Sequence, residues 1–288
     1  MIIKKRGSIR VLGILLAVLV FASANAVKVY AMPFYALSPK HLTVRASFST
    51  SYEKSIEERK WNIRLASKAI NNTIVDVGGE FSFNRVVGPR TEIRGYKTAK
   101  IILDGAFADG VGGGVCQVST TLYNAVVLAG LQVTEYHPHS LPVSYVPASR
   151  DAMVNSGSAD LRFVNCTNNP IIVQSEATDT SIKIKIIGEP LKVEYFIESE
   201  ITEVVSAPDY IVSKDEKNEY PELYEGERLY LSYSKEGVKS KATLISRKNG
   251  KVVTVKKLRS DTYKPVQGRV IEGTAKRPIV ENIEKPFE

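Results

Sequence analysis

The sequence has few of the residues that build metal centres and disulfide frameworks. It contains two cysteines, Cys116 and Cys166, and three histidines among 288 residues. Two cysteines allow at most one disulfide bond. Cys116 with His137 and His139 makes a poor zinc site, because one proline separates the two histidines and no second cysteine pair is present. The glycines at 110–114 also lack the spacing of a dinucleotide fingerprint, so we expect no metal and no other cofactor.

Negative charge is absent from the N-terminal segment. Residues 1–26 hold no acidic residue, and half of the net charge of +8 comes from their basic residues Lys4, Lys5, Arg6 and Arg10. An apolar run at 11–22 and the small residues at 24–26 complete the pattern of an export signal. The run is shorter than the roughly 20 residues of a membrane span, but it could extend to residue 36. Residues 1–31 are therefore either a signal peptide or a membrane anchor.

Both alternatives predict the same location for the rest of the chain. A positively charged flank stays in the cytoplasm, so the residues after the apolar run are exported. We expect an extracytoplasmic protein, in the cell wall or at the outer face of the cytoplasmic membrane. Only the N-terminal segment would touch the membrane.

The remaining charge excess is too small to indicate nucleic-acid binding, since no stripe of basic residues alternates with aromatic residues. Hydrophobic residues make up 43% of the chain and charged residues 24%, which is typical of a globular protein with a real core. No internal repeat is evident. We expect no nucleic-acid partner, and the composition does not indicate an oligomeric state.

Helical patterns precede a strand-rich region, which predicts an α+β fold with a largely antiparallel sheet. Thr50 and Glu53 have the spacing of a capping box, and apolar residues at helical spacing follow them to Ile74. A second helix, which carries Cys116, is expected from residue 115 to Gly130, a residue type common after a helix C-terminus. Strands are expected at 81–83, 98–103, 132–136, 142–146, 161–164, 171–176, 181–187 and 192–197.

Shifts in composition divide the expected structure into regions. A catalytic domain at 45–198 follows the N-terminal segment. The more polar residues 199–228 suggest a linker, and 229–275 suggest a small all-β unit with a hairpin turn at 247–251. Residues 276–288 resemble a charged tail.

Cys116 has the surroundings of a reactive thiol. It follows three glycines at the expected start of a helix, where unpaired N–H groups and the helix dipole favour a thiolate. The glycines let the backbone pass close to a substrate, and the N–H groups of residues 116 and 117 are candidates for an oxyanion hole. Cys166 lies in an asparagine-rich stretch that indicates a turn, so we interpret it as an incidental thiol.

His137 and His139 are the candidate bases for this thiol, about twenty residues further along the chain. We favour His139 because a short strand is expected after it, although both could belong to a polar turn. Asp151 and Asp160 are candidates to orient the imidazole. The predicted catalytic set is Cys116, His139, His137 and Asp160. The predicted substrate-binding set, in which the two arginines would clamp a carboxylate, is Gly113, Gly114, Gln117, Ser119, Tyr123, Arg150 and Arg162.

These motifs together resemble the VanW domain, a family named for a protein of vancomycin-resistance clusters. The resemblance covers about residues 55–190 and rests on the stretches 78–84, 88–91, 95–96, 112–125, 139–140 and 160–163. The segment around Ser260–Pro265 resembles the G-five domain. One loop departs from the family pattern: Ser149 stands where the family has glycine, and Met153 where it has threonine.

The resemblance implies work on peptidoglycan stem peptides, since some VanW proteins act as L,D-transpeptidases. Cys116 would attack the third residue of a stem tetrapeptide, His139 would protonate the departing D-Ala, and an amine of a neighbouring stem would resolve the thioester into a 3→3 cross-link. Two alternatives remain open. One is a cysteine peptidase of stem peptides. The other is a non-catalytic wall-binding or glycopeptide-resistance accessory protein, which predicts that Cys116 is buried or bonded to Cys166.

Overall fold

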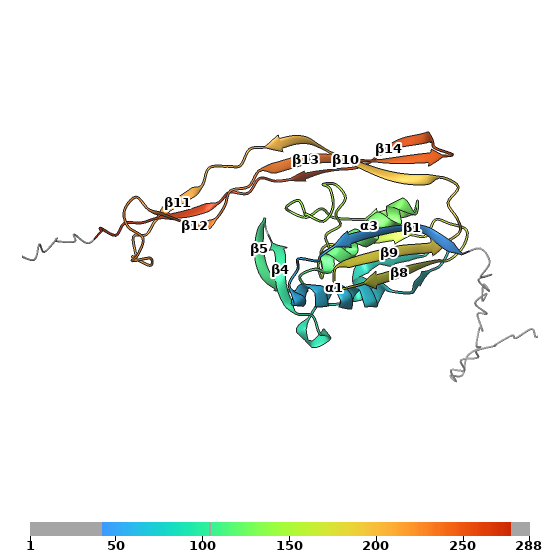
Figure 1. Ribbon diagram of the computed structural model, residues 1–288, viewed down its shortest axis with the longest axis horizontal. Helices are drawn as coiled ribbons and strands as arrows, with labels where there is room; N and C mark the ends of the chain where they lie inside the picture. Colours follow the sequence, from blue (N-terminus) through green and yellow to red (C-terminus); the bar gives the residue numbers. More distant parts are fainter. Residues whose placement is uncertain (1–41, 104, 278–288) are drawn as a thin grey trace, which may run out of the picture. The chain divides into compact units, whose positions relative to one another are not determined.

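A computed structural model describes residues 42–103 and 105–277 (Figure 1). The expected leader and nearly all of the expected charged tail lie outside these residues. Within the described part of the chain, no helix has both the length and the hydrophobicity needed to cross a membrane. Helices and a mostly antiparallel set of strands form the structure, which confirms the α+β prediction.

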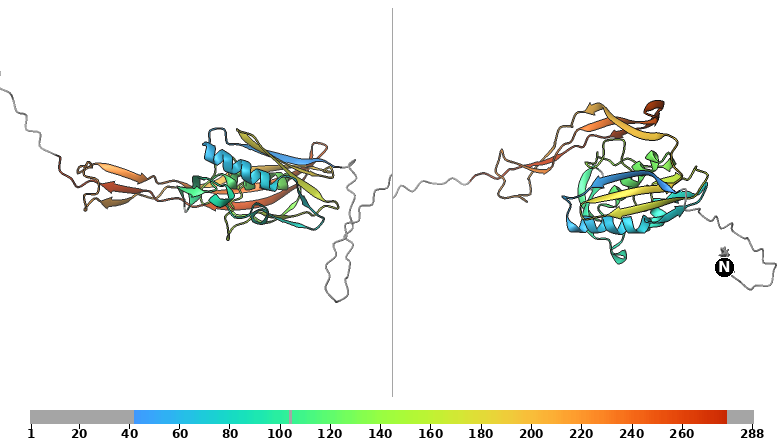
Figure 2. Two further views of the ribbon diagram at one scale, coloured as in Figure 1. Left: turned by 90° about the horizontal axis from the view of Figure 1, so that it is seen from below. Right: turned by 45° about the vertical axis from the view of Figure 1, so that its right-hand side comes forward.

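A four-stranded antiparallel sheet is the base on which the two long helices pack. Its order is β1-β9-β8-β2, with bounds Thr43–Ser51, Ser181–Gly188, Ile171–Ala177 and Thr73–Val75. Helix α1 (Glu57–Ile70) contacts β8, and helix α3 (Val115–Leu128) contacts β1 and β9. The two helices also contact each other, so they cover the same face of the sheet (Figures 1 and 2).

Strand β9 shows how the sequence pattern builds this core. Ile182, Ile184 and Ile186 are fully buried beneath the helices, while Lys183 between them is exposed. Successive side chains of a strand point to opposite faces, so the alternation of isoleucine and lysine fixes which face receives the helices.

We expect Ile184→Ala to lower the free energy of unfolding by about 2–5 kcal/mol, because it removes buried methylene groups and leaves a cavity. Lys183→Ala, one residue away on the exposed face, is the matched control and should change the free energy of unfolding by less than about 0.5 kcal/mol. Urea denaturation followed by circular dichroism measures both. Equal effects of the two substitutions would contradict the assignment of the buried face.

Smaller elements frame the helix that carries Cys116. A three-stranded sheet has the order β3-β7-β6 (Glu80–Ser82, Arg162–Val164, Gln132–Glu135), and β4 and β5 (Thr98–Leu103, Ala106–Val111) form a hairpin. The short helix α2 (Phe83–Val87) and the 3-10 helix η2 (Glu92–Arg94) lie between β3 and β4 in the chain. The strands expected at 98–103, 132–136, 161–164, 171–176 and 181–187 are confirmed.

The first helix begins later than the capping box predicted. Thr50 lies in β1 and its hydroxyl is 2.8 Å from that of Thr121 in α3, so it is not available to cap a helix. The helix begins at Glu57 after Ile56, which makes no side-chain cap. It ends at Ile70, because the chain turns at Asn72 (φ 60°) and Ile74 enters β2. The strand expected at 142–146 was also wrong, since that stretch forms no regular element.

The C-terminal half adds two three-stranded sheets. One has the order β10-β13-β14 (Glu194–Val205, Gly237–Lys248, Lys251–Tyr263), and the other β11-β15-β12 (Ile211–Lys214, Arg269–Glu272, Arg228–Ser232). The turn joining β13 to β14 is the hairpin that the sequence predicted, with Asn249 and Gly250 both at positive φ. Residues 199–228, expected as a linker, include the second half of β10 and all of β11.

Candidate active site

The glycine motif fixes the position of the α3 N-terminus through close backbone contacts. Gly114 precedes the helix with φ 108°, a left-handed conformation that disfavours other residues. A Cβ atom on Gly113 would lie 2.7 Å from the carbonyl oxygen of Lys100 in β4, and one on Gly114 would lie 3.0 Å from the Arg59 and Ile63 side chains of α1. The glycines therefore let β4 and α1 approach the first turn of α3 closely.

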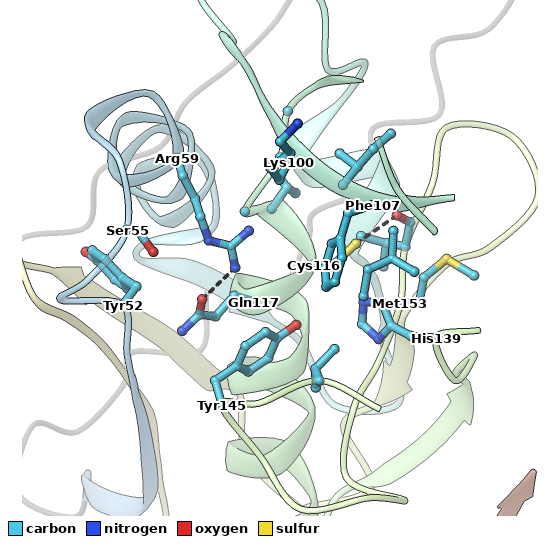
Figure 3. Close-up of a pocket in the computed structure, with 18 of the residues that line it drawn as sticks. Tyr52, Ser55, Arg59, Lys100, Phe107, Cys116, Gln117, His139, Tyr145 and Met153 are labelled. Carbon is cyan, nitrogen blue, oxygen red and sulfur yellow. Dashed lines mark hydrogen bonds between the residues drawn. The ribbon is translucent and has the colours of Figure 1, made fainter. Parts of the chain in front are cut away.

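Cys116, His139 and Asp151 form a connected group at this helix start. Cys116 is partly exposed and lies beside His139 (Figure 3), while His139 is 6% exposed. The Nδ1 atom of His139 is 2.7 Å from Oδ2 of Asp151, and the same oxygen accepts the backbone N–H of His139 at 2.7 Å. Asp151 therefore fixes both the position and the orientation of the imidazole, whose other nitrogen is left for the thiol.

The charges of this group favour a thiolate and an imidazolium. Burial by itself raises the pKa of the Cys116 thiol, but the hydrogen bond and charge of His139 and the smaller effect of Arg90 outweigh it, so the pKa is lowered. Burial by itself lowers the pKa of His139, but the hydrogen bonds with Asp151 and Cys116 raise it to about 9. The burial of Asp151 is likewise outweighed by His139, and its pKa is lowered. All three directions fit an ion pair held by a carboxylate.

A cavity of about 930 Å³ opens in front of Cys116. The β4–β5 hairpin supplies an apolar wall that includes Ile101, Ile102 and Phe107, of which Phe107 is largely exposed. Apart from the Cys116–His139 pair, the charged residues around the cavity are one acid and four bases: Glu53, Lys54, Arg59, Arg90 and Lys100. The pocket is therefore suited to a ligand that combines apolar groups with negative charge.

Asp160, which we included in the predicted catalytic set, lies in a different network. Its carboxylate accepts the Ser82 hydroxyl at 2.6 Å and the Asn84 backbone N–H at 2.8 Å, and it pairs with Arg162 at 3.1 Å. It thereby holds the start of α2 against β7. The imidazole is oriented by Asp151 instead, the other candidate, because its loop passes beside His139.

His137 and Arg162 also lie outside the cavity. Nε2 of His137 is 2.9 Å from Oε1 of Glu135. Arg162 interacts with Glu80, Glu135 and Asp160 on the three-stranded sheet, so its guanidinium is engaged by carboxylates of the protein itself. The predicted roles of these two residues in proton transfer and substrate binding are not supported by this geometry.

The polar side of α3 packs against the loop at 149–154 and does not line the cavity. The Ser119 hydroxyl donates to the backbone oxygen of Ala152 at 2.6 Å, and the side chain of Tyr123 is 1% exposed. Arg150 donates to the side chain of Asn124 at 2.9 Å and lies over Phe48. None of the three lines the cavity. Polar helix residues can be buried in this way because the loop at 149–154 offers backbone groups as partners.

Gln117 and the two glycines of the predicted binding set do line the cavity, but Gln117 is tied to its neighbours. Its side chain accepts from Arg59 at 2.9 Å (Figure 3) and donates to the backbone oxygen of Ser51 at 2.8 Å. Its backbone N–H donates to Gly114 at 2.9 Å, which removes it from the predicted oxyanion hole. Within residues 42–103 and 105–277, the N–H of Cys116 has no backbone acceptor, so it remains a candidate for the oxyanion donor.

Several lining residues were missed by the sequence analysis, notably Arg59, Phe107 and Tyr145. Arg90 lies in the stretch 88–91 that resembles the VanW domain, but its position in the sequence did not indicate that it would act on Cys116. These residues come from α1, from the β4–β5 hairpin and from an irregular loop, so no single stretch of sequence carries the signal. Both cysteines are free, and Cys166 is exposed, away from the cavity. Within the described residues, no group of three or more histidine, cysteine, aspartate or glutamate side chains is arranged so that it could hold a metal ion.

Comparison with known proteins matches the region that contains this site. The family model described as VanW like protein matches residues 58–187. The uncharacterized protein YoaR of Bacillus subtilis (strain 168) is 42% identical over 164 residues, 57% of this chain and 52% of that protein. The vancomycin B-type resistance protein VanW of Enterococcus faecalis (strain ATCC 700802 / V583) is 28% identical over 126 residues, 42% of this chain and 46% of that protein.

The chain spans about half the length of both curated relatives. Among solved structures, the G5 domain of IgA1 protease matches 31% of this chain and 100% of its own, at 22% identity and a TM-score of 0.19. The family model covers the glycine motif, Cys116, His139 and Asp151 together. Residues 58–187 of the chain, with the Cys116–His139–Asp151 group among them, therefore match the VanW family.

Proposed function

We propose that this protein is an exported, cysteine-dependent acyltransferase of the cell wall, specifically an L,D-transpeptidase that forms 3→3 cross-links. The observation that supports this most directly is the Cys116–His139–Asp151 group at the edge of a large cavity. A partly exposed thiol with a lowered pKa, next to an oriented imidazole, is the arrangement that nucleophilic acyl transfer requires.

In the first half of the reaction, the Cys116 thiolate attacks the carbonyl carbon of the third residue of a stem tetrapeptide. The N–H of Cys116 stabilises the negative charge that develops on the carbonyl oxygen. The bond to the terminal D-Ala breaks, and its nitrogen takes the proton of the His139 imidazolium. The products are free D-Ala and a thioester on Cys116.

In the second half, the side-chain amine of a neighbouring stem attacks the thioester carbon. The neutral imidazole of His139 accepts the proton from this amine, and the carbon–sulfur bond breaks to regenerate the thiolate. Asp151 keeps its hydrogen bond to His139 throughout and stabilises the imidazolium each time it forms. Water in place of the amine would give hydrolysis.

The charge of the cavity supports a stem peptide as the acyl donor. Such peptides carry free carboxylates, and four of the five charged residues around the cavity are basic. The relative that carries the name of vancomycin B-type resistance also fits an action on the cell wall.

We expect Lys100→Ala to raise the KM for the donor about 3–10-fold with little change in kcat. The substitution removes a positive charge at the cavity and frees Asp109, now 2.9 Å from Lys100, to repel carboxylates. Lys183→Ala, on the far face of β9, serves as the control. The effect should shrink as salt is added, because exposed charges are screened. A KM that is unchanged at low salt would contradict a role for this charge.

The proposed function is tested by incubating the full-length protein with purified disaccharide-tetrapeptide and analysing both substrate and protein by mass spectrometry. We expect a cross-linked dimer that has lost one D-Ala, and a transient acyl adduct on the peptide containing Cys116. Shortened tripeptide without dimer would favour the peptidase. Unchanged substrate without an adduct on Cys116 would overturn the proposal in favour of a wall-binding protein.

A further inference from the structure

The two oxygens of Asp151 face different parts of the molecule. Oδ2 contacts His139. Oδ1 is 2.6 Å from the hydroxyl of Tyr263, at the end of β14. Asp151 is 1% exposed and Tyr263 is also 1% exposed, so water does not compete for this contact. A residue more than a hundred positions away in the chain therefore completes the environment of the carboxylate.

The direction of the Tyr263 hydrogen bond is fixed by a second contact. The backbone N–H of Ser149 lies 2.9 Å from the Tyr263 hydroxyl oxygen and can only donate to it. The hydroxyl proton is therefore free to be donated to Asp151. Through this pair of bonds, Tyr263 holds the start of the loop and the carboxylate at a fixed distance from each other.

Arg259, four residues earlier on β14, holds the same loop through its backbone. Its Nη1 donates to the backbone oxygen of Asp151 at 2.6 Å, and Nη2 lies 3.7 Å from Oδ1. The guanidinium is itself held by Asp261 at 2.6 Å and lies over the ring of Tyr136 at 4.1 Å from the centroid. Its side chain is completely buried, which is costly unless such partners are present.

The loop adopts a conformation that needs this support. Ser149 has φ 60°, a left-handed conformation that is unfavourable for serine. Its hydroxyl lies 2.7 Å from that of Ser240 in β13, in addition to the contact of its N–H with Tyr263. Contacts from β13 and β14 thus hold the residue in place two positions before Asp151.

We propose that Tyr263 and Arg259 are positioning residues for the Cys116–His139–Asp151 group, so that the C-terminal β13–β14 hairpin is part of the active site. This inference rests on the proposed function, because it assigns these residues a role in activating Cys116. It goes beyond the family domain at 58–187, which contains neither residue. Neither residue touches substrate; both act by fixing the carboxylate that orients His139.

The test measures the reaction of Cys116 with iodoacetamide in the full-length protein as a function of pH. We expect Tyr263→Phe to slow labelling at pH 7 by about tenfold and to move the acid limb of the profile to higher pH. A tenfold change in rate corresponds to about the free energy that a hydrogen bond to a charged group contributes. Without this bond the Asp151 carboxylate is held less firmly, so it stabilises the His139 imidazolium less. Tyr233→Phe, on an exposed tyrosine, is the matched control and should leave both unchanged.

Two further measurements separate positioning from folding. Circular dichroism and the Tm show whether the Tyr263→Phe protein is folded. Arg259→Lys, which keeps the charge but loses the forked donors, should also move the acid limb to higher pH in a folded protein. An unshifted profile for both folded variants would overturn the inference. If instead wild-type Cys116 reacts no faster than an ordinary thiol at pH 7, the proposed function itself fails.

Discussion

Cys116→Ala is expected to abolish acyl transfer, with a loss of about 10⁴–10⁶-fold, because it removes the thiol that forms the covalent intermediate. The protein should remain folded. Cys116 is partly exposed, and the substitution removes one weak contact with the backbone, in which Sγ lies 3.3 Å from the carbonyl oxygen of Val154. The loss of activity can then be assigned to chemistry rather than to folding.

The control for this substitution is the second thiol of the chain. Cys166 is exposed and outside the cavity, so Cys166→Ala should retain full activity. The measurement is the rate of dimer formation from disaccharide-tetrapeptide, with the Tm of each variant recorded in parallel. Activity that survives in Cys116→Ala would show that the cross-linking chemistry lies elsewhere.

Loss of the base should give the second largest effect. We expect His139→Ala to slow acyl transfer by about 10²–10⁴-fold, because the thiol loses its partner and the leaving amine loses its proton donor. His137→Ala, the competing candidate, should stay near the wild-type rate, since that imidazole is paired with Glu135 outside the cavity. A larger loss for His137→Ala than for His139→Ala would reverse the assignment.

The pairing of Cys116 with His139 also predicts how thiol labelling and acyl transfer change with pH. In the wild type, the lowered pKa of Cys116 should keep the thiol reactive toward iodoacetamide below the range of an ordinary cysteine. Acyl transfer should fall as the pH rises through about 9, where His139 loses the proton that the leaving amine needs. In His139→Ala the acid limb of labelling should move to higher pH, because the thiolate has lost the neighbouring positive charge.

Local chemistry made some features of the fold predictable. The turn at 247–251 was predicted because asparagine followed by glycine tolerates two successive positive φ values, and that preference does not depend on the rest of the molecule. The capping box at Thr50 predicted the wrong helix start, because the partner of a hydroxyl group does depend on the rest of the molecule. A hydroxyl can cap a helix or bond to a distant helix, and here the partner is Thr121, seventy-one residues away.

The same distinction applies to the candidate site. Cys116 and His139 were identified because a glycine-flanked thiol and a nearby imidazole have few alternative interpretations. We placed Asp160 rather than Asp151 in the predicted catalytic set, although both follow the histidine at distances that an irregular loop can bridge, and the structure places Asp151 on the imidazole. Contacts with Tyr263 and Arg259 hold the loop that contains Asp151, and no pattern near residue 151 reports them.

The contact between Tyr263 and Asp151 has a consequence for biogenesis. A chain is synthesised from its N-terminus, so Cys116, His139 and Asp151 are all made well before residue 263. During that interval the carboxylate of Asp151 would lack the Tyr263 hydroxyl as a partner, and the proposed role of Tyr263 predicts a less reactive thiol. On the role proposed for Tyr263, a newly made molecule would acquire its full thiol reactivity only after the β13–β14 hairpin has packed against the loop that contains Asp151.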